Sequence, residues 1–236
     1  HYHDYNFLNV YQKLHGFCVI ELGGFYLDVI KDRVYTTQVD SNARRSAQTS
    51  MYHIVEMFSR VMAPILSFTA DEIWQNIPGE RTESIFLSDF DQAITDFIES
   101  ADFSDQFWLK LMAVKTAVNK ELENKRAEKV LGSSLSAEVV LYCDEELTGL
   151  LTKLASELRF AFIVSNVFIL PVDEAGATAV ETGISGLKVK VAASGHSKCT
   201  RCWHHSEDIG ADIAHPEICS RCVENIAGVG ENRQFV

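Results

Sequence analysis

The chain has 236 residues and a formal net charge of −12 at pH 7, and 47% of its residues are hydrophobic. This composition is typical of globular proteins and excludes a collagen-like, coiled-coil or wholly disordered chain. No apolar run reaches the ~18 residues that a transmembrane helix needs, and the start lacks the basic and apolar regions of a signal peptide. Because the first residue is not methionine, we expect a piece of a longer protein.

The negative charge taken alone argues against a nucleic-acid partner, but it is unevenly distributed. Residues 71–105 hold ten acidic residues and one arginine. In the rest of the chain, 20 basic residues nearly balance 23 acidic ones. A basic surface outside the acidic segment is therefore not excluded.

Helical periodicity dominates the first part of the chain. Apolar residues three and four apart predict a helix over residues 4–31, which Gly23-Gly24 is expected to loosen or break. Residues 32–39 are expected to form a connection. Asp40 or Ser41 is a good N-cap for a second helix, which a proline ends or kinks about 20 residues later.

The pattern then changes from helices to a mixture of strands and helices. Residues 80–103 are expected to be a short extended piece and a loop, and Ser104 to cap a long helix that ends at about Lys129. The remaining predicted elements form a small α+β unit: strands at 137–142 and 187–191, a helix at 145–158, and a strand-rich stretch at 160–170 with a possible turn at Ser165-Asn166.

The strongest motif is a pair of C-x-x-C turns near the end of the chain. Its cysteines are Cys199, Cys202, Cys219 and Cys222, with sixteen residues between the pairs. This spacing predicts one zinc ion held by four thiolates, and it implies a reducing, cytoplasmic compartment. Four sulfur ligands leave no open position, so the site should be structural. Loss of the metal is expected to unfold the last ~40 residues and to spare the helical part.

Three residues in the cysteine turns have two interpretations each. Arg201 and Arg221 occupy equivalent places and could hold phosphates, or they could contact a neighbouring carboxylate or solvent. Trp203 could stack on a base or pack over the zinc site. No catalytic constellation stands out, because the chain has no Walker loop, no G-x-S-x-G and no H-E-x-x-H.

Three stretches of the helical part carry a further signal: Tyr2–Phe7, Leu27–Arg33 and Met62–Trp74. They resemble the anticodon-binding domain of class I aminoacyl-tRNA synthetases. Combined with the terminal C-x-R-C-W and C-x-R-C sequences, the whole chain resembles bacterial isoleucyl-tRNA synthetases in particular. Formamidopyrimidine-type DNA glycosylases end in a similar zinc finger.

The resemblance implies a mainly α fold in three parts. A helical bundle of the anticodon-binding type would span residues 1–130, a small α+β junction domain 131–194, and a zinc finger 195–236. The parent enzyme, a monomer, would attach isoleucine to its tRNA using ATP. The family's nucleotide-binding signatures are missing, so no catalytic residue is carried over, and the chain alone is expected to be inactive as a ligase.

The partners that the resemblance implies are the anticodon arm of the isoleucine tRNA and the rest of the synthetase chain, with no membrane. Basic side chains would contact phosphates, and aromatic or polar ones would contact unstacked bases. The candidate tRNA-binding residues are Lys31, Arg33, Tyr35, Thr37, Gln38, Arg44, Arg45, Arg201, Trp203 and Arg221. The basic helix over residues 110–129 is the second candidate.

Two other functions remain open at this point. A C-terminal part of a formamidopyrimidine-type DNA glycosylase would need a helix–two-turn–helix before the finger, whereas the preceding 60 residues are rich in strand signals. A structural zinc module would bind no nucleic acid, and a tRNA-binding assay separates it from a tRNA-recognition part.

Overall fold

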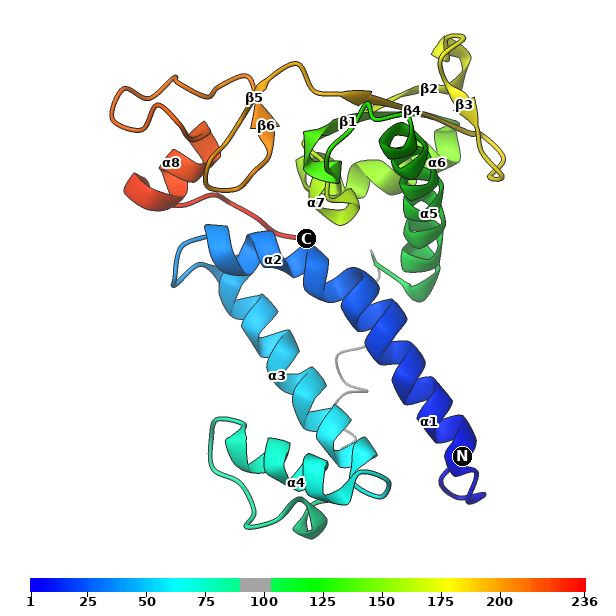
Figure 1. Ribbon diagram of the computed structural model, residues 1–236, viewed down its shortest axis with the longest axis vertical. Coiled ribbons are helices and arrows are strands. Elements are labelled where there is room, and N and C mark those ends of the chain that lie inside the picture. The colour runs from blue at the N-terminus through cyan, green and yellow to red at the C-terminus, as the bar shows by residue number, and fades with distance from the viewer. Residues whose placement is uncertain (90–102) are drawn as a thin grey trace. The chain divides into compact units, whose positions relative to one another are not determined.

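The computed structural model describes residues 1–89 and 103–236, which form two compact units (Figure 1). The described residues of the first unit are 1–28 and 44–89, and those of the second are 29–43 and 103–236. The two units do not test the expected three-part division at residues 130 and 194, which stays a prediction. Within the described residues, no helix has both the length and the apolar character that crossing a membrane requires.

The first three helical segments follow one another without a break, and short connections separate the next two helices. Their bounds are α1 Phe7–Gly16, the π-helix η1 Phe17–Tyr26, α2 Leu27–Thr36, α3 Asn42–Met62 and α4 Ser67–Asn76. Because α2 extends to Thr36, the expected connection over residues 32–39 is wrong in its bounds, and the true connection is short. The expected start of the second helix is confirmed, since α3 begins directly after Ser41.

Gly23-Gly24 loosens the helix into a π-helix and does not break it, which is the first of the two expected outcomes. An added Cβ on Gly23 would lie 2.9 Å from the carbonyl oxygen of Cys18, and one on Gly24 would lie 3.1 Å from that of Val19. Both contacts reach back five residues, the spacing of π-helical hydrogen bonds. The two glycines therefore let the backbone close into the wider π-helix without a steric clash.

The core of the first unit lies where α4 and the following 3₁₀ turn η2 (Ile85–Leu87) meet α3. Trp74 is 3% exposed and donates a hydrogen bond from its indole nitrogen to the Thr82 carbonyl. Asp71 accepts from the backbone N–H of Ile85, which fixes the turn against α4. Of the expected extended piece and loop, residues 90–102 lie outside the described residues.

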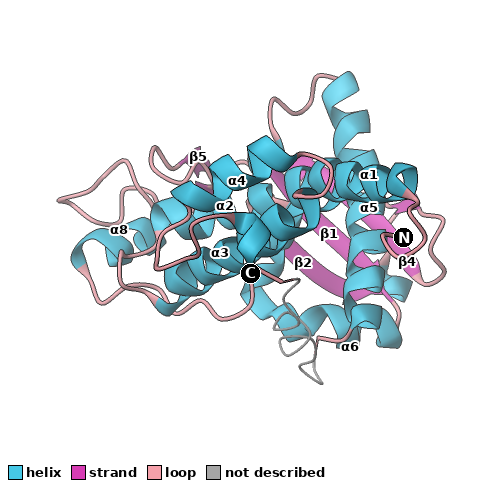
Figure 2. Ribbon diagram, turned by 90° about the horizontal axis from the view of Figure 1, so that it is seen from below, coloured by secondary structure: helices cyan, strands magenta, loops and turns pink. Residues whose placement is uncertain are grey.

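The second unit contains a four-stranded mixed sheet. Its strands are β1 Ala137–Cys143, β2 Asn166–Pro171, β3 Val180–Glu181 and β4 Leu187–Ala193, in the order β2-β1-β4-β3. β1 pairs parallel to β2 and antiparallel to β4, so that Val139 lies opposite both Val167 and Val191. Buried and half-exposed residues alternate along most of β1 and β4, because helices cover one face of the sheet (Figure 2).

Three helical segments and the long helix α5 (Asp105–Ala127) pack on this sheet. The segments are α6 Glu145–Leu151, η5 Thr152–Glu157 and α7 Leu158–Phe162. The predicted cap is confirmed, because the Ser104 hydroxyl accepts from the Phe107 N–H. The predicted strand from residue 160 is wrong in its first half, since its first residues end α7 and are buried beneath the sheet.

The end of the chain forms a small finger. A two-stranded sheet pairs β5 Ser197–Lys198 with β6 His205–Ser206, and α8 spans Ser220–Ala227. The elements are short, so the segment has little apolar core of its own.

The glycine pair of the π-helix generates a testable contrast. Gly23→Ala should lower the free energy of unfolding by about 1–3 kcal/mol, because the new methyl group meets a backbone oxygen. Gly16→Ala, in the same run of helix, should raise it by about 0.5–1 kcal/mol, since nothing lies within 4 Å of its added Cβ. Urea unfolding followed by far-ultraviolet circular dichroism measures both, and shifts of equal sign and size would contradict the π-helix.

Candidate metal centre and the ion pairs beside it

The finger brings the four cysteines of the sequence motif together. Cys199 and Cys202 lie in the turn between β5 and β6, which is closed by a hydrogen bond from the Cys199 N–H to the His204 carbonyl. Cys219 immediately precedes α8, and Cys222 lies in its first turn. All four cysteines are buried.

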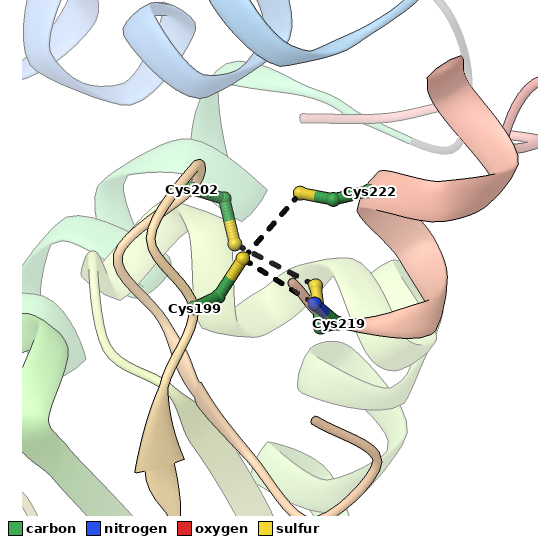
Figure 3. Close-up of side chains that lie close together, drawn as sticks. All are labelled: Cys199, Cys202, Cys219 and Cys222. Carbon is green, nitrogen blue, oxygen red and sulfur yellow. Dashed lines mark hydrogen bonds between the residues drawn. The ribbon is translucent and has the colours of Figure 1, made fainter. Parts of the chain in front are cut away.

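The sulfur positions fit a tetrahedral zinc ion. The four Sγ atoms lie within 4.8 Å of one another, with 3.8 Å between Cys199 and Cys222 and 3.7 Å between Cys202 and Cys219 (Figure 3). A tetrahedron with Zn–S bonds of ~2.3 Å has edges of about 3.8 Å. Four thiolates complete the shell and leave no place for an activated water, so the chemistry of the site is structural.

Neighbouring donors favour the thiolate form that zinc requires. The Cys219 N–H donates to the Sγ of Cys199 at 3.4 Å, and the Arg201 guanidinium donates to the Sγ of Cys222 at 3.7 Å. A deprotonated, hydrogen-bonded sulfur is the state in which cysteine binds a metal.

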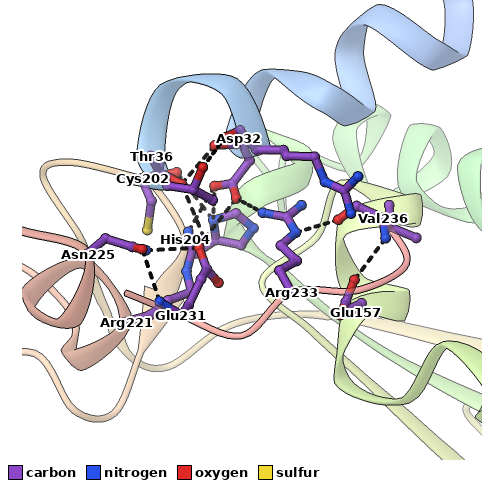
Figure 4. A network of polar contacts seen from close by, with 12 residues as sticks. Asp32, Thr36, Glu157, Cys202, His204, Arg221, Asn225, Glu231, Arg233 and Val236 are labelled. Carbon is purple, nitrogen blue, oxygen red and sulfur yellow. Dashed lines mark hydrogen bonds and ion pairs between the residues drawn. The ribbon is translucent and has the colours of Figure 1, made fainter. Parts of the chain in front are cut away.

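The two equivalent arginines of the cysteine turns both reach the end of α2. Arg201 donates to the Thr36 carbonyl at 2.8 Å. Arg221 donates from Nη1 and Nη2 to the two carboxylate oxygens of Asp32, each at 2.8 Å, and Nη1 also lies 3.0 Å from Glu231 (Figure 4). Of the two interpretations of Arg221, the structure therefore supports contact with a carboxylate.

Asp32 is the centre of this polar network. Arg233 donates to it as well, and the ring of His204 lies 4.0 Å away. Burial alone would raise the pKa of the Asp32 carboxyl, but the hydrogen bonds and positive charge of Arg221, with the charges of Arg233 and His204, outweigh it and hold this pKa well below its usual range. Sequence analysis missed Asp32, because its arginine partners lie 189 and 201 residues away.

The last residues of the chain are fixed by a second carboxylate. Glu157 accepts hydrogen bonds from the backbone N–H groups of Gln234, Phe235 and Val236 at 2.6, 2.8 and 2.8 Å. The guanidinium of Arg233 lies over the ring of Phe160, 3.6 Å from its centroid. The tail thereby keeps Arg233 in place beside Asp32 (Figure 4).

The structure places the ten candidate tRNA-binding residues in different environments. Four have exposed side chains: Lys31, Tyr35, Arg45 and Trp203. Four are half-buried: Gln38, Arg44, Arg201 and Arg221. Arg33 and Thr37 are buried. Trp203 is 58% exposed, and the Lys198 ammonium lies 5.1 Å from its ring centroid. The partly buried hydrophobic residues packed against the four cysteines are Ile209 and Ile218.

The basic helix of the second candidate surface, α5, uses several of its charges internally. Lys115 is buried and donates to the Ala161 carbonyl at 2.6 Å. Other cations pair with glutamates: Lys110 with Glu146, Lys125 with Glu121 and Glu128, and Arg126 with Glu123. This pairing lowers the positive potential that α5 presents to a polyanion.

Of the two cysteines outside the motif, Cys143 is buried in β1. Burial, with the charge of Asp144, raises the pKa of its thiol to about 11, which favours the protonated form at neutral pH. Cys18 is half-buried in η1. Neither belongs to the cluster of four.

Comparison with known proteins places this fold and site in a class. Residues 1–141 match the family described as "Anticodon-binding domain of tRNA ligase", and residues 197–225 match "Zinc finger found in FPG and IleRS". The chain belongs to the family of tRNA-ligase anticodon-binding domains, with a zinc finger near its end.

Several relatives cover the chain almost from end to end. Isoleucine–tRNA ligases of Pseudomonas putida (strain GB-1) and Stutzerimonas stutzeri (strain A1501) are 55% and 56% identical over 100% and 99% of this chain. The isoleucine–tRNA ligase of Pseudomonas aeruginosa (strain UCBPP-PA14) is 52% identical over 99%. The chain spans about a quarter of the length of these curated relatives. A glycosylase origin accounts for the finger alone and leaves these matches unexplained.

Fully reduced protein should contain one zinc ion per chain, because the four sulfurs already lie at tetrahedral distances. Cys202→Ser should abolish stoichiometric binding, since it removes one of the four ligands. Cys18→Ser, outside the cluster, should leave the zinc content at one. Elemental analysis of freshly purified protein measures all three, and a metal-free parent chain would overturn the assignment.

Proposed function

We propose that this chain is the tRNA-recognition part, from the C-terminal end, of an isoleucine–tRNA ligase that attaches isoleucine to its tRNA using ATP. The observation that carries the proposal is the 52–56% identity to isoleucine–tRNA ligases over essentially the whole chain. The match of residues 1–141 to an anticodon-binding domain supports the same role. The remaining three quarters of such an enzyme would supply adenylation and editing.

Within that enzyme, the chain binds the anticodon arm of the tRNA. The exposed candidates have the chemistry that an RNA loop requires: Lys31 and Arg45 carry charge for phosphates, and Tyr35 and Trp203 carry rings for unstacked bases. For the six half-buried and buried candidates, contact with tRNA stays a prediction. The zinc ion has a structural role, the protein acts in the cytoplasm, and the full enzyme is a monomer.

Removing two exposed charges tests the tRNA surface. The double variant Lys31→Ala/Arg45→Ala should weaken tRNA binding and lower its salt dependence, with the slope falling by roughly 0.7–0.9 for each phosphate that is no longer neutralised. It should weaken different tRNAs about equally, because phosphates carry no sequence information. Titrations with isoleucine tRNA and a second tRNA at several salt concentrations measure both effects.

A charge-matched control is available in β4. Lys188→Ala/Lys190→Ala removes the same net charge from a different surface and should leave the salt slope unchanged. If the two double variants behave alike, residues 31–45 are not the contact surface. If the parent chain binds no tRNA at all, the proposed function itself fails.

A second prediction concerns catalysis. The chain alone should show no isoleucine-dependent exchange of pyrophosphate into ATP, because the nucleotide-binding signatures of the family are missing from its sequence. Exchange that persists in protein freed of host synthetase, and that disappears on denaturation, would contradict the assignment of this chain as a recognition part.

A further inference from the structure

The zinc finger and the end of α2 are joined by the arginines of the cysteine turns. Arg201 lies between Thr200 and Cys202, and Arg221 between Ser220 and Cys222. Because each arginine directly precedes a cysteine ligand, fixing that ligand also fixes the backbone position of the arginine. Both side chains contact the last turn and a half of α2 rather than solvent.

The geometry of these contacts is specific. A helix leaves its last four carbonyl groups without intrahelical partners, and Arg201 donates to one of them, the carbonyl of Thr36, at 2.8 Å. Arg221 forms a two-pronged hydrogen bond with Asp32, a geometry that an arginine fork provides and a lysine cannot. Thr36 links the two contacts, because its hydroxyl donates to the Asp32 carbonyl.

The zinc-loaded finger carries negative charge next to arginines. Arg201 donates to the Sγ of Cys222, and both Arg201 and Arg221 reach α2. Asp32 pairs with Arg221 and Arg233, and Glu231 pairs with Arg221. Zn²⁺ with four thiolates carries a formal charge of −2, which adds to that of the two carboxylates beside these arginines.

We propose that Asp32 is a positioning residue: through Arg221 it transmits zinc loading to the end of α2 and to the connection that follows, residues 29–43. The part of the inference that concerns RNA rests on the proposed function, because exposed candidates for tRNA contact lie in this segment. The positioning role itself does not require tRNA.

The proposal changes the expected consequence of metal loss. Without zinc the two cysteine turns are no longer held together, so Arg201 and Arg221 lose their fixed positions. Asp32 then retains only Arg233 and the distant ring of His204. The sequence predicted that metal loss would spare the helical part, whereas the contacts predict that residues 29–43 loosen together with the finger.

Hydrogen exchange of the intact chain, read by mass spectrometry, tests this coupling. In the zinc-loaded parent, amides of residues 29–43 should be protected, and chelation of the zinc should lower their protection by about tenfold or more. In the Asp32→Asn variant, the amides of residues 29–43 should lose protection to the same extent as in the chelated parent, even with one zinc bound per chain. Asp173→Asn, at an exposed acid outside this segment, should behave like the parent.

A milder variant covers the possibility that Asp32→Asn fails to fold. Arg221→Lys keeps the charge but loses one prong of the hydrogen bond, and it should lower the protection of 29–43 in the same direction while the amides of β1 and β4 stay protected. The proposal is overturned if 29–43 keeps parental protection in a zinc-loaded Asp32→Asn or Arg221→Lys variant whose sheet is intact. It is also overturned if chelation leaves these amides unchanged in the parent.

A tRNA titration separates this proposal from the proposed function. Loss of protection with weaker tRNA binding in zinc-loaded Asp32→Asn supports both. Loss of protection with unchanged tRNA affinity supports the positioning role and contradicts the placement of the tRNA surface at residues 31–45. Parental protection with weaker binding overturns the positioning role, because Asp32 would then act on tRNA by another route.

Discussion

The ion pair between Asp32 and Arg221 is the contact on which the arrangement of the finger and α2 depends, because it joins residues 189 positions apart. Desolvating two charges costs several kcal/mol for each ion, and only good geometry with further hydrogen bonds offsets this. Here both carboxylate oxygens accept from one guanidinium, and Arg233 adds a donor. Removing one partner of such a pair typically costs about 3–5 kcal/mol, because the other charge stays buried.

Those elements of the fold that depend on adjacent residues could be predicted from the sequence. The cap at Ser104 and the alternation from Leu187 to Val191 are contained in a few contiguous side chains, and both are confirmed. Gly23-Gly24 left two outcomes open, and the local π-helix shows that the helix loosens without breaking. An error arose where distant partners matter: Phe160 has a high strand propensity, but it ends up in α7, buried against His204 and Arg233.

The candidate site, too, could be predicted from the sequence only where its signal lies in adjacent residues. Cysteine spacing specifies the four ligands, because a C-x-x-C turn is a local structure. Asp32 carried no such signal: it lies between Lys31 and Arg33, so its neighbours indicated a basic surface. The repeated arginine in the two turns was the one available clue, and it was equally compatible with phosphate and carboxylate. Only the folded geometry distinguishes the two.

Zinc acts in this protein both as a cross-link and as part of a charged group, the zinc–thiolate dianion. As a cross-link it closes a segment whose short elements cannot form a core, and it holds the two turns that carry Arg201 and Arg221. As part of a dianion it also balances arginines that reach α2, and this effect extends to residues 29–43, which are grouped in one compact unit with the finger. A helical domain and a zinc finger that look separable in the sequence therefore share one electrostatic balance. The arginines nearest the metal have an internal role, so RNA contact depends on the side chains that this balance leaves exposed.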